Sequence, residues 1–208
     1  PASVPPAHLQ LIAGLLDRGT RRCPSMKELT IRENELYGCE ANWRVMRDLD
    51  SFSLNFYVSF VAPQRVNTDS YEREIWQHIL ECIREPFLLD EGFSEELFER
   101  DRLNYLAYLQ QLERQPLSRA TLQALRKVMP DEHFARPLTG SRSEAESASL
   151  DGLRDSFSKL LDHAPLVASA CGPVEVEKIA DNISAFAANT SRRGMPTTTP
   201  YTPPSKAL

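Results

Sequence analysis

Histidine is the side chain best suited both to proton transfer near neutral pH and to metal binding, so the histidines are considered first. They are His8, His78, His133 and His163. These residues are far apart in the sequence, and a metal cluster would need several elements to bring them together. We therefore expect surface histidines, or histidines that support other residues, and no histidine-based metal site.

The four cysteines could bind zinc or form a redox-active pair only if their spacing allowed it. They are Cys23, Cys39, Cys82 and Cys171. They form no C-x-x-C pair and have no histidine at ligand spacing, so the sequence contains neither a zinc ribbon nor a redox motif. We expect four buried, reduced thiols, because free cysteine is among the most buried residue types.

One group of carboxylates is dense enough to suggest acid–base catalysis. Its members are Glu95, Glu96, Glu99 and Asp101. They fall in the first turns of a predicted helix, where the helix dipole favours negative charge, and a solvated helix start explains them. The sequence has no G-x-S-x-G signature for nucleophilic catalysis, and its eight glycines include no phosphate-binding loop.

The composition is that of an ordinary globular protein. With 208 residues, 41% of them hydrophobic and 25% charged, the chain can form one domain with a substantial core. A net charge of -5 gives no attraction to phosphate backbones, so nucleic acid is not an expected partner. No apolar run approaches the ~20 residues of a membrane span, and the start lacks the features of a signal peptide. We expect a cytoplasmic protein.

Helical and strand periodicities alternate in the first third of the chain. Residues 6–18 have apolar side chains at helical spacing, and Gly19 ends that pattern. Ser25 and Glu28 form the capping-box pattern that opens a second helix, which Gly38 ends. Between residues 40 and 61 the spacing changes to two, which predicts two antiparallel strands joined by a turn at 48–51.

The aromatic residues of these strands form a stripe that could bind a peptide or form the core of the sheet. They are Trp43, Phe52, Phe56 and Phe60. Strict alternation with polar residues favours the core.

Helical patterns dominate the rest of the chain. We predict helices ending before Pro86, between Ser94 and Pro116, at 117–129, at 150–161 and at 174–186, and a short buried strand at 166–170. Together the elements predict an α+β domain over residues 1–190, with an antiparallel sheet and helices packed on one face. The proline- and threonine-rich residues 191–208 predict a linker or extended arm.

Five segments, in this order, resemble sequence segments of pitrilysin/insulinase-type (inverzincin) zinc peptidases. They are LLDRGT, ELYGCEANWRVMRDLDSFSLNFYV, IREPFLLDEGFSEELFERDRLNYL, PDEHFARPLTGSRSEAESASLDGLRDSF and LVASACGPVEVEKI. The resemblance covers about residues 9–188 and implies the N-terminal half of such a subunit, with the metallohydrolase fold of the mitochondrial processing peptidase. The segment around His133 and Phe134 matches a family stretch, although a loop anchored by its aromatic ring is the favoured interpretation.

The family's zinc site is an H-x-x-E-H helix plus a distant glutamate. The resemblance places these positions at Gln10, Ala13, Gly14 and Leu106. An amide, a methyl group, a glycine and a leucine do not supply the donors that zinc requires. The resemblance therefore implies no catalytic, cofactor-binding or metal-binding residue in this chain, and zinc is expected in a partner chain.

The resemblance implies a non-catalytic subunit or half that pairs with an active zinc peptidase chain and helps to enclose a peptide substrate. The first strand or strands and the second half of the family's subunit are missing from the sequence, so the sheet is expected to have exposed edges. Two alternatives stay open. One is a structural or assembly subunit without peptide contact, and the other is a metal site completed by another chain to which this one lends a carboxylate.

Overall fold

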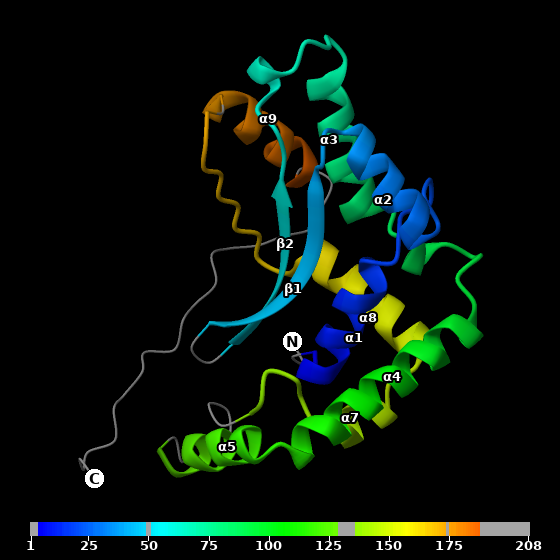
Figure 1. Cartoon of the computed structure of the whole chain (residues 1–208), viewed down its shortest axis with the longest axis vertical. Coiled ribbons are helices and arrows are strands. Elements are labelled where there is room, and N and C mark those ends of the chain that lie inside the picture. Colours follow the sequence, from blue (N-terminus) through cyan, green and yellow to red (C-terminus); the bar gives the residue numbers. More distant parts are fainter. Residues whose placement is uncertain (1–3, 49–50, 129–135, 174, 188–208) are drawn as a thin grey trace.

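The computed structural model describes residues 4–48, 51–128, 136–173 and 175–187 (Figure 1). The elements, in chain order, are α1 (Pro6–Leu16), α2 (Met26–Glu35), β1 (Glu40–Asp48), β2 (Ser51–Ser59), η1 (Pro63–Arg65), α3 (Tyr71–Arg84), η2 (Phe87–Leu89), α4 (Glu95–Arg114), α5 (Pro116–Val128), α7 (Arg142–Glu146), α8 (Leu150–His163) and α9 (Val176–Ala187). The predicted α+β class is confirmed. In the described part of the chain, no helix is both long and apolar enough to cross a membrane.

Local signals in the sequence set the ends of the first two helices. Pro6 occupies the first turn of α1, where its missing N–H costs no hydrogen bond. Ser25 caps α2 by accepting a hydrogen bond from the backbone N–H of Glu28, whose side chain binds the backbone N–H of Ser25 in return. The predicted capping box is thus confirmed, and it fixes where the chain turns toward β1.

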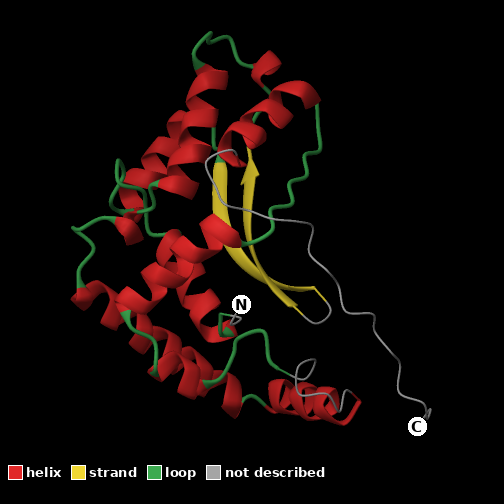
Figure 2. Cartoon of the chain, turned by 180° about the vertical axis from the view of Figure 1, so that it is seen from behind, coloured by secondary structure: helices red, strands yellow, loops and turns green. Residues whose placement is uncertain are grey.

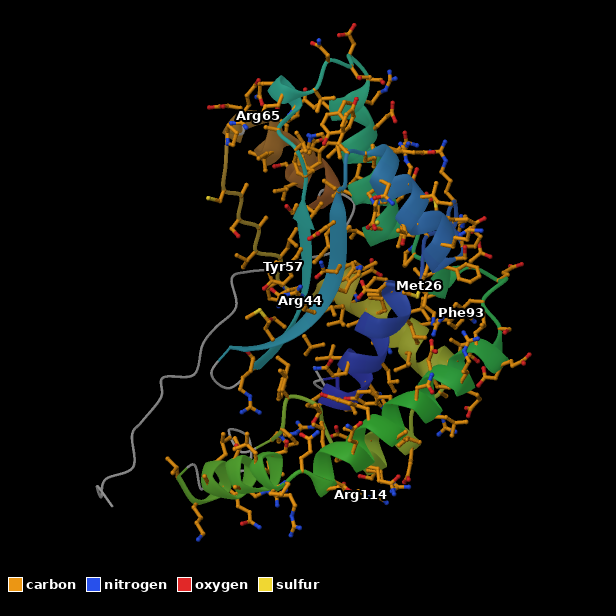
Figure 3. All side chains as sticks on the ribbon, in the orientation of Figure 1. Met26, Arg44, Tyr57, Arg65, Phe93 and Arg114 are labelled. Atoms are coloured by element: carbon orange, nitrogen blue, oxygen red, sulfur yellow. The ribbon has the colours of Figure 1, made fainter. Side chains whose placement is uncertain are left out.

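In the described residues the sheet consists of two antiparallel strands, β1 and β2, with Trp43 opposite Phe56 and Val45 opposite Leu54. These apolar side chains share one face, while the other face carries exposed residues such as Arg44 and Tyr57. Figure 3 shows Arg44 and Tyr57 next to each other on the hairpin, and the guanidinium carbon lies 5.5 Å from the centre of the tyrosine ring. The strand alternation predicted from the sequence is confirmed.

The main core lies between α1, η2, α4 and α8, and it extends to the apolar face of the sheet (Figure 2). Its fully buried side chains include Ile12, Phe98, Leu153 and Phe157. Trp43 connects this core to the sheet, since its ring lies 4.9 Å from Phe56 and 5.9 Å from Phe157, centre to centre. A second cluster, around Leu36 and Ile75, fills the space between α2, α3 and β2.

The aromatic stripe belongs to the sheet core, as its alternation predicted. Trp43, Phe52, Phe56 and Phe60 are half-buried and pack against buried clusters. This packing leaves the peptide-binding interpretation of the stripe without support.

The predicted buried strand at 166–170 is wrong. These residues lie outside the regular elements and are exposed, with 42% of Leu166 and 74% of Val167 accessible to solvent. A strand needs a neighbouring strand to satisfy its backbone, and in the described residues only β1 and β2 form a sheet. The predicted tail at 191–208 and the segment around His133 and Phe134 lie outside the described residues.

Candidate functional site

The three α1 positions that the sequence resemblance aligns with the zinc-binding helix, Gln10, Ala13 and Gly14, have different surroundings. The Nε2 atom of Gln10 donates a hydrogen bond to the backbone oxygen of Leu138, at 3.2 Å. Ala13 is buried in a small cluster with Leu9 and Val45. Gly14 is exposed and has open space where a side chain would begin.

The fourth position, Leu106 of α4, contributes to a cluster with Ala7, Leu109 and Ala145. This cluster joins α4 to the first turn of α1 and to α7. Helix α4 therefore passes close to α1, as a distant ligand of a shared site would require, but the side chain that it brings there is apolar.

The loop that precedes α7 lies across both helices. The hydroxyl of Tyr105 in α4 donates a hydrogen bond to the backbone oxygen of Thr139, at 2.6 Å. On the other side, the carboxylate of Glu144 accepts hydrogen bonds from Arg136, at 2.8 Å, and from the backbone N–H of Ala7, at 3.4 Å. The loop carbonyl groups of Leu138 and Thr139 thus accept hydrogen bonds from Gln10 of α1 and Tyr105 of α4.

The residues at these four positions do not fit a zinc ion. Zinc in proteins takes nitrogen, sulfur or carboxylate donors, usually three or four of them. Of the four positions only Gln10 has a polar side chain, and its amide is already hydrogen-bonded to the loop. Across the described residues, no group of three or more His, Cys, Asp or Glu side chains is arranged to hold a metal ion.

The structure keeps the described histidines apart. His8 lies 2.9 Å from the backbone oxygen of Glu144 through its Nε2 atom, and His163 is at the exposed end of α8. His78 is buried in α3, where its Nε2 atom is 3.7 Å from the Cys82 sulfur and 4.0 Å from a Glu33 oxygen. Burial lowers the pKa of His78 below its ordinary value, so the imidazole is held neutral.

The prediction of four buried thiols is wrong for two of them. Cys39 and Cys82 are buried, but Cys23 is half-buried and Cys171 is exposed. Burial raises the pKa of Cys39 to about 11, which keeps this thiol protonated and weakly nucleophilic. Cys171 is exposed because it follows the stretch that was predicted as a strand and lies outside the sheet.

The carboxylates near the start of α4 divide into two groups. Glu95 and Glu96 lie in the first turn of the helix and are exposed, as predicted. Asp101 instead forms a two-pronged ion pair with Arg18, which follows α1. This pair ties the end of α1 to α4, so the prediction of a solvated carboxylate is wrong for Asp101, whose partner is 83 residues away in the sequence.

Two carboxylates that the sequence did not single out accept backbone hydrogen bonds from β1. An Asp17 oxygen accepts from the N–H of Trp43, at 2.8 Å, and a Glu33 oxygen accepts from the N–H of Ala41, at 3.3 Å. Burial raises the pKa of Asp17 to about 6, although the Trp43 hydrogen bond and the nearby Arg44 charge act in the opposite direction. Burial also raises the pKa of Glu33.

We expect Asp17→Asn to remove a pH dependence of stability. The pKa of Asp17 is about 6 in the folded protein, above the ordinary value of 3.8. Between these two pH values the Asp17 carboxyl is therefore protonated in the folded state and ionised in the unfolded state. The Asp17 contribution to stability therefore falls as pH rises from about 4 to about 6 and is constant above that range. Asparagine can still accept the Trp43 hydrogen bond but has no charge to bury.

The measurement is urea unfolding of both proteins between pH 4 and pH 8. From pH 4 to pH 8, the free energy of unfolding of the variant should rise by about 1 kcal/mol relative to that of the wild type. This figure is smaller than the full pKa shift would give, because Asp17 is only half-buried. Asp151→Asn serves as the control, since the side chain of Asp151 is 98% exposed. Parallel pH profiles for wild type and Asp17→Asn would contradict the expectation.

Comparison with protein-family models gives no match, and comparison with curated proteins gives no significant one. Solved structures do share the fold. A conserved protein from Enterococcus faecalis V583 superposes with a TM-score of 0.75 at 19% identity, over 90% of this chain and 44% of that one. A peptidase M16 inactive domain from Pseudomonas fluorescens gives 0.66 at 14% identity, over 97% and 45%.

A protein described as an M16-like peptidase from Alicyclobacillus acidocaldarius gives a TM-score of 0.54 at 12% identity, over 90% of this chain and 39% of that one. The chain thus spans less than half the length of each of these structures. The resemblance to pitrilysin-type peptidases predicted from the sequence is confirmed at the level of the fold.

Proposed function

We propose that this chain is a non-catalytic half or subunit of a pitrilysin/insulinase-type peptidase, which pairs with an active zinc peptidase chain and helps to enclose a peptide substrate. One observation carries the proposal. The fold is that of M16-type peptidases, yet the positions of the zinc ligands hold Gln10, Gly14 and Leu106, and the position of the catalytic glutamate holds Ala13.

Two further observations support it. One of the similar structures is itself described as an inactive M16 domain, so this fold exists without catalysis in at least that protein. In addition, the chain corresponds to less than half of each similar structure, so it matches one part of a larger assembly of this fold. On this proposal the zinc belongs to the partner chain, and this chain has no catalytic, cofactor-binding or metal-binding residue of its own.

The remaining parts of the proposal follow from the sequence. Residues 1–190 form the peptidase-like domain, and residues 191–208 form a linker or extended arm. The assembly is a hetero-oligomer that processes peptides in the cytoplasm.

The test is purification of the tagged chain at its native expression level, followed by identification of the proteins bound to it. The proposal expects a partner chain with an intact H-x-x-E-H helix, together with zinc and a peptidase activity that a chelator abolishes. Stoichiometric zinc in this chain by itself, or chelator-sensitive cleavage by it in isolation, would refute the proposal.

A structural or assembly subunit without peptide contact is the second candidate, and one observation favours it. An extended peptide that paired with the outer edge of β1 would need backbone N–H groups, but those of Ala41 and Trp43 are already bound by Glu33 and Asp17. Binding of extended peptides, measured with and without the partner chain, separates the two candidates. Absence of binding in both conditions would favour the scaffold.

A further inference from the structure

His78 is a buried polar side chain that the proposed function does not use. It is 2% exposed and lies on α3, in the part of the core that α2, α3 and β2 enclose. Its Nε2 atom is 3.7 Å from the Cys82 sulfur and 4.0 Å from the Oε1 atom of Glu33. Imidazole changes its charge near neutral pH, so this approach to a carboxyl group of another helix couples the packing of the two helices to pH.

Glu33 connects α2 to two other elements. The Oε1 atom that lies near His78 also accepts the hydrogen bond from the backbone N–H of Ala41 in β1, at 3.3 Å. The backbone oxygen of Glu33 accepts hydrogen bonds from the N–H groups of Gly38 and Cys39, at 3.0 and 3.1 Å. Figure 1 shows α2 and α3 side by side, so Glu33 and His78 lie where these helices meet the start of β1.

Burial dominates the charge balance at His78. It lowers the pKa of the imidazole, while the Glu81 carboxylate of the same helix raises that pKa and Arg32 of α2 lowers it further. The Cys82 thiol supplies no negative charge, because burial raises its pKa and keeps it protonated. A positive charge on His78 is therefore unfavourable while α2 and α3 remain packed together.

Burial has the opposite effect on the pKa of Glu33. It raises the pKa of this carboxyl, the Ala41 hydrogen bond lowers it, and the negative charges of Asp17 and Glu40 raise it further. The first proton that the pair binds on acidification therefore removes a buried charge at Glu33. The second proton creates a buried charge at His78.

We propose that Glu33 and His78 form a proton-linked clasp between α2 and α3, which opens in acid when both groups are protonated. At neutral pH the carboxylate holds the Ala41 N–H and faces a neutral imidazole. When His78 becomes charged, the carboxyl beside it is already neutral and no longer offsets the charge. Separation of α2 from α3 lets the imidazolium reach water, so acid favours the open form.

The two groups contribute to the closed form with opposite pH dependences. The folded pKa of His78 is below its ordinary 6.5, so the His78 contribution is lost as the pH falls below that value. The folded pKa of Glu33 is above its ordinary 4.5, so the Glu33 contribution is present at low pH and is lost as the pH rises through the folded value. Glu33 thus delays the acid opening that His78 drives.

The Cys82 thiol provides a direct readout of opening. It is 7% exposed and lies against His78, so a thiol reagent reaches it only when α2 and α3 separate. Dithiodipyridine reacts with thiols in acid, and mass spectrometry of peptides measures the labelling of each cysteine as a function of pH. Cys171 is exposed and serves as the reference for the reactivity of the reagent. Circular dichroism verifies that the rest of the domain stays folded.

Three variants of the full chain separate the roles of the two groups. In the wild type, the labelling of Cys82, relative to its value at pH 7, should rise as the pH falls. His78→Gln should abolish this rise, because an amide cannot take up the charge. Glu33→Gln should shift the rise to higher pH, since its amide still accepts the Ala41 hydrogen bond but takes up no proton. Glu35→Gln is the matched control, because it removes a charge from the same helix at a side chain that is 61% exposed, and it should behave as the wild type.

The titration of Asp17 is common to all four proteins and does not distinguish them. A rise in Cys82 labelling that persists in His78→Gln would overturn the proposal, as would a wild type whose Cys82 stays unlabelled until the whole domain unfolds. Identical pH profiles for Glu33→Gln and Glu35→Gln would also overturn it. These measurements need no peptidase partner, so the clasp is tested independently of the proposed function.

Discussion

Replacing Phe157 by alanine is expected to lower the free energy of unfolding by about 3–5 kcal/mol, the cost of truncating a fully buried phenylalanine. The Phe157 side chain is 0% exposed and lies in the main core between α8 and α1. Its ring also contacts Trp43 edge-on, at 5.9 Å between ring centres. Because this contact joins α8 to the sheet, the cavity would affect both layers of the domain.

Urea unfolding followed by tryptophan fluorescence is the appropriate measurement, since Trp43 would report the lost contact directly. Leu117→Ala is the control, because the side chain of Leu117 is 79% exposed in α5, where no residue is buried. The control should change stability by less than about 0.5 kcal/mol. A similar small effect at Phe157 would show that α8 does not pack on the sheet as described.

The second large effect is expected at Gly140, in the loop that crosses α1 and α4. Its φ of +68° lies in the left-handed region, and a Cβ atom there would lie 2.3 Å from the backbone nitrogen of Ala7. It would also lie 2.7 Å from the Ala7 side chain. Since the obstacle is backbone, Gly140→Ala must displace the loop from α1, and we expect a loss of about 3 kcal/mol or more.

Gly38→Ala separates the two causes of this loss. Gly38 has a similar φ of +74°, but nothing lies within 4 Å of the position of its missing Cβ. Its substitution should therefore cost only the conformational strain, about 1–2 kcal/mol. If the two variants lose equal stability, the close packing of the loop on α1 is not present in solution.

The features that were predicted correctly depend on neighbours in the sequence. The α2 capping box needs only Ser25 and Glu28, and the β1–β2 hairpin needs only alternation on both sides of a short turn. The prediction of a strand at 166–170 was wrong because an apolar segment forms a strand only where a partner strand is available. The pattern cannot show whether such a partner exists.

The candidate site likewise has some features that neighbouring residues predict and others that depend on residues far apart in the sequence. The alignment of Gln10 and Gly14 with zinc-ligand positions is a prediction made by counting back from Gly19, and it uses only neighbouring residues. The loop that covers these positions depends on contacts between Tyr105 and Thr139, and between Ala7 and Glu144, which are 34 and 137 residues apart. The Asp17 and Glu33 caps on β1 are similarly tertiary, and no spacing rule predicts them.

The caps on β1 also limit how large an assembly of this chain can become. A fibril grows only when each molecule offers two adhesive edges, one for the molecule before it and one for the molecule after it. Here Asp17 and Glu33 have already taken the N–H groups of Ala41 and Trp43, so strand pairing does not propagate from molecule to molecule through the β1 edge. The hairpin is thereby protected from the open-ended strand pairing that would make an uncharged, aromatic-rich strand an amyloid hazard.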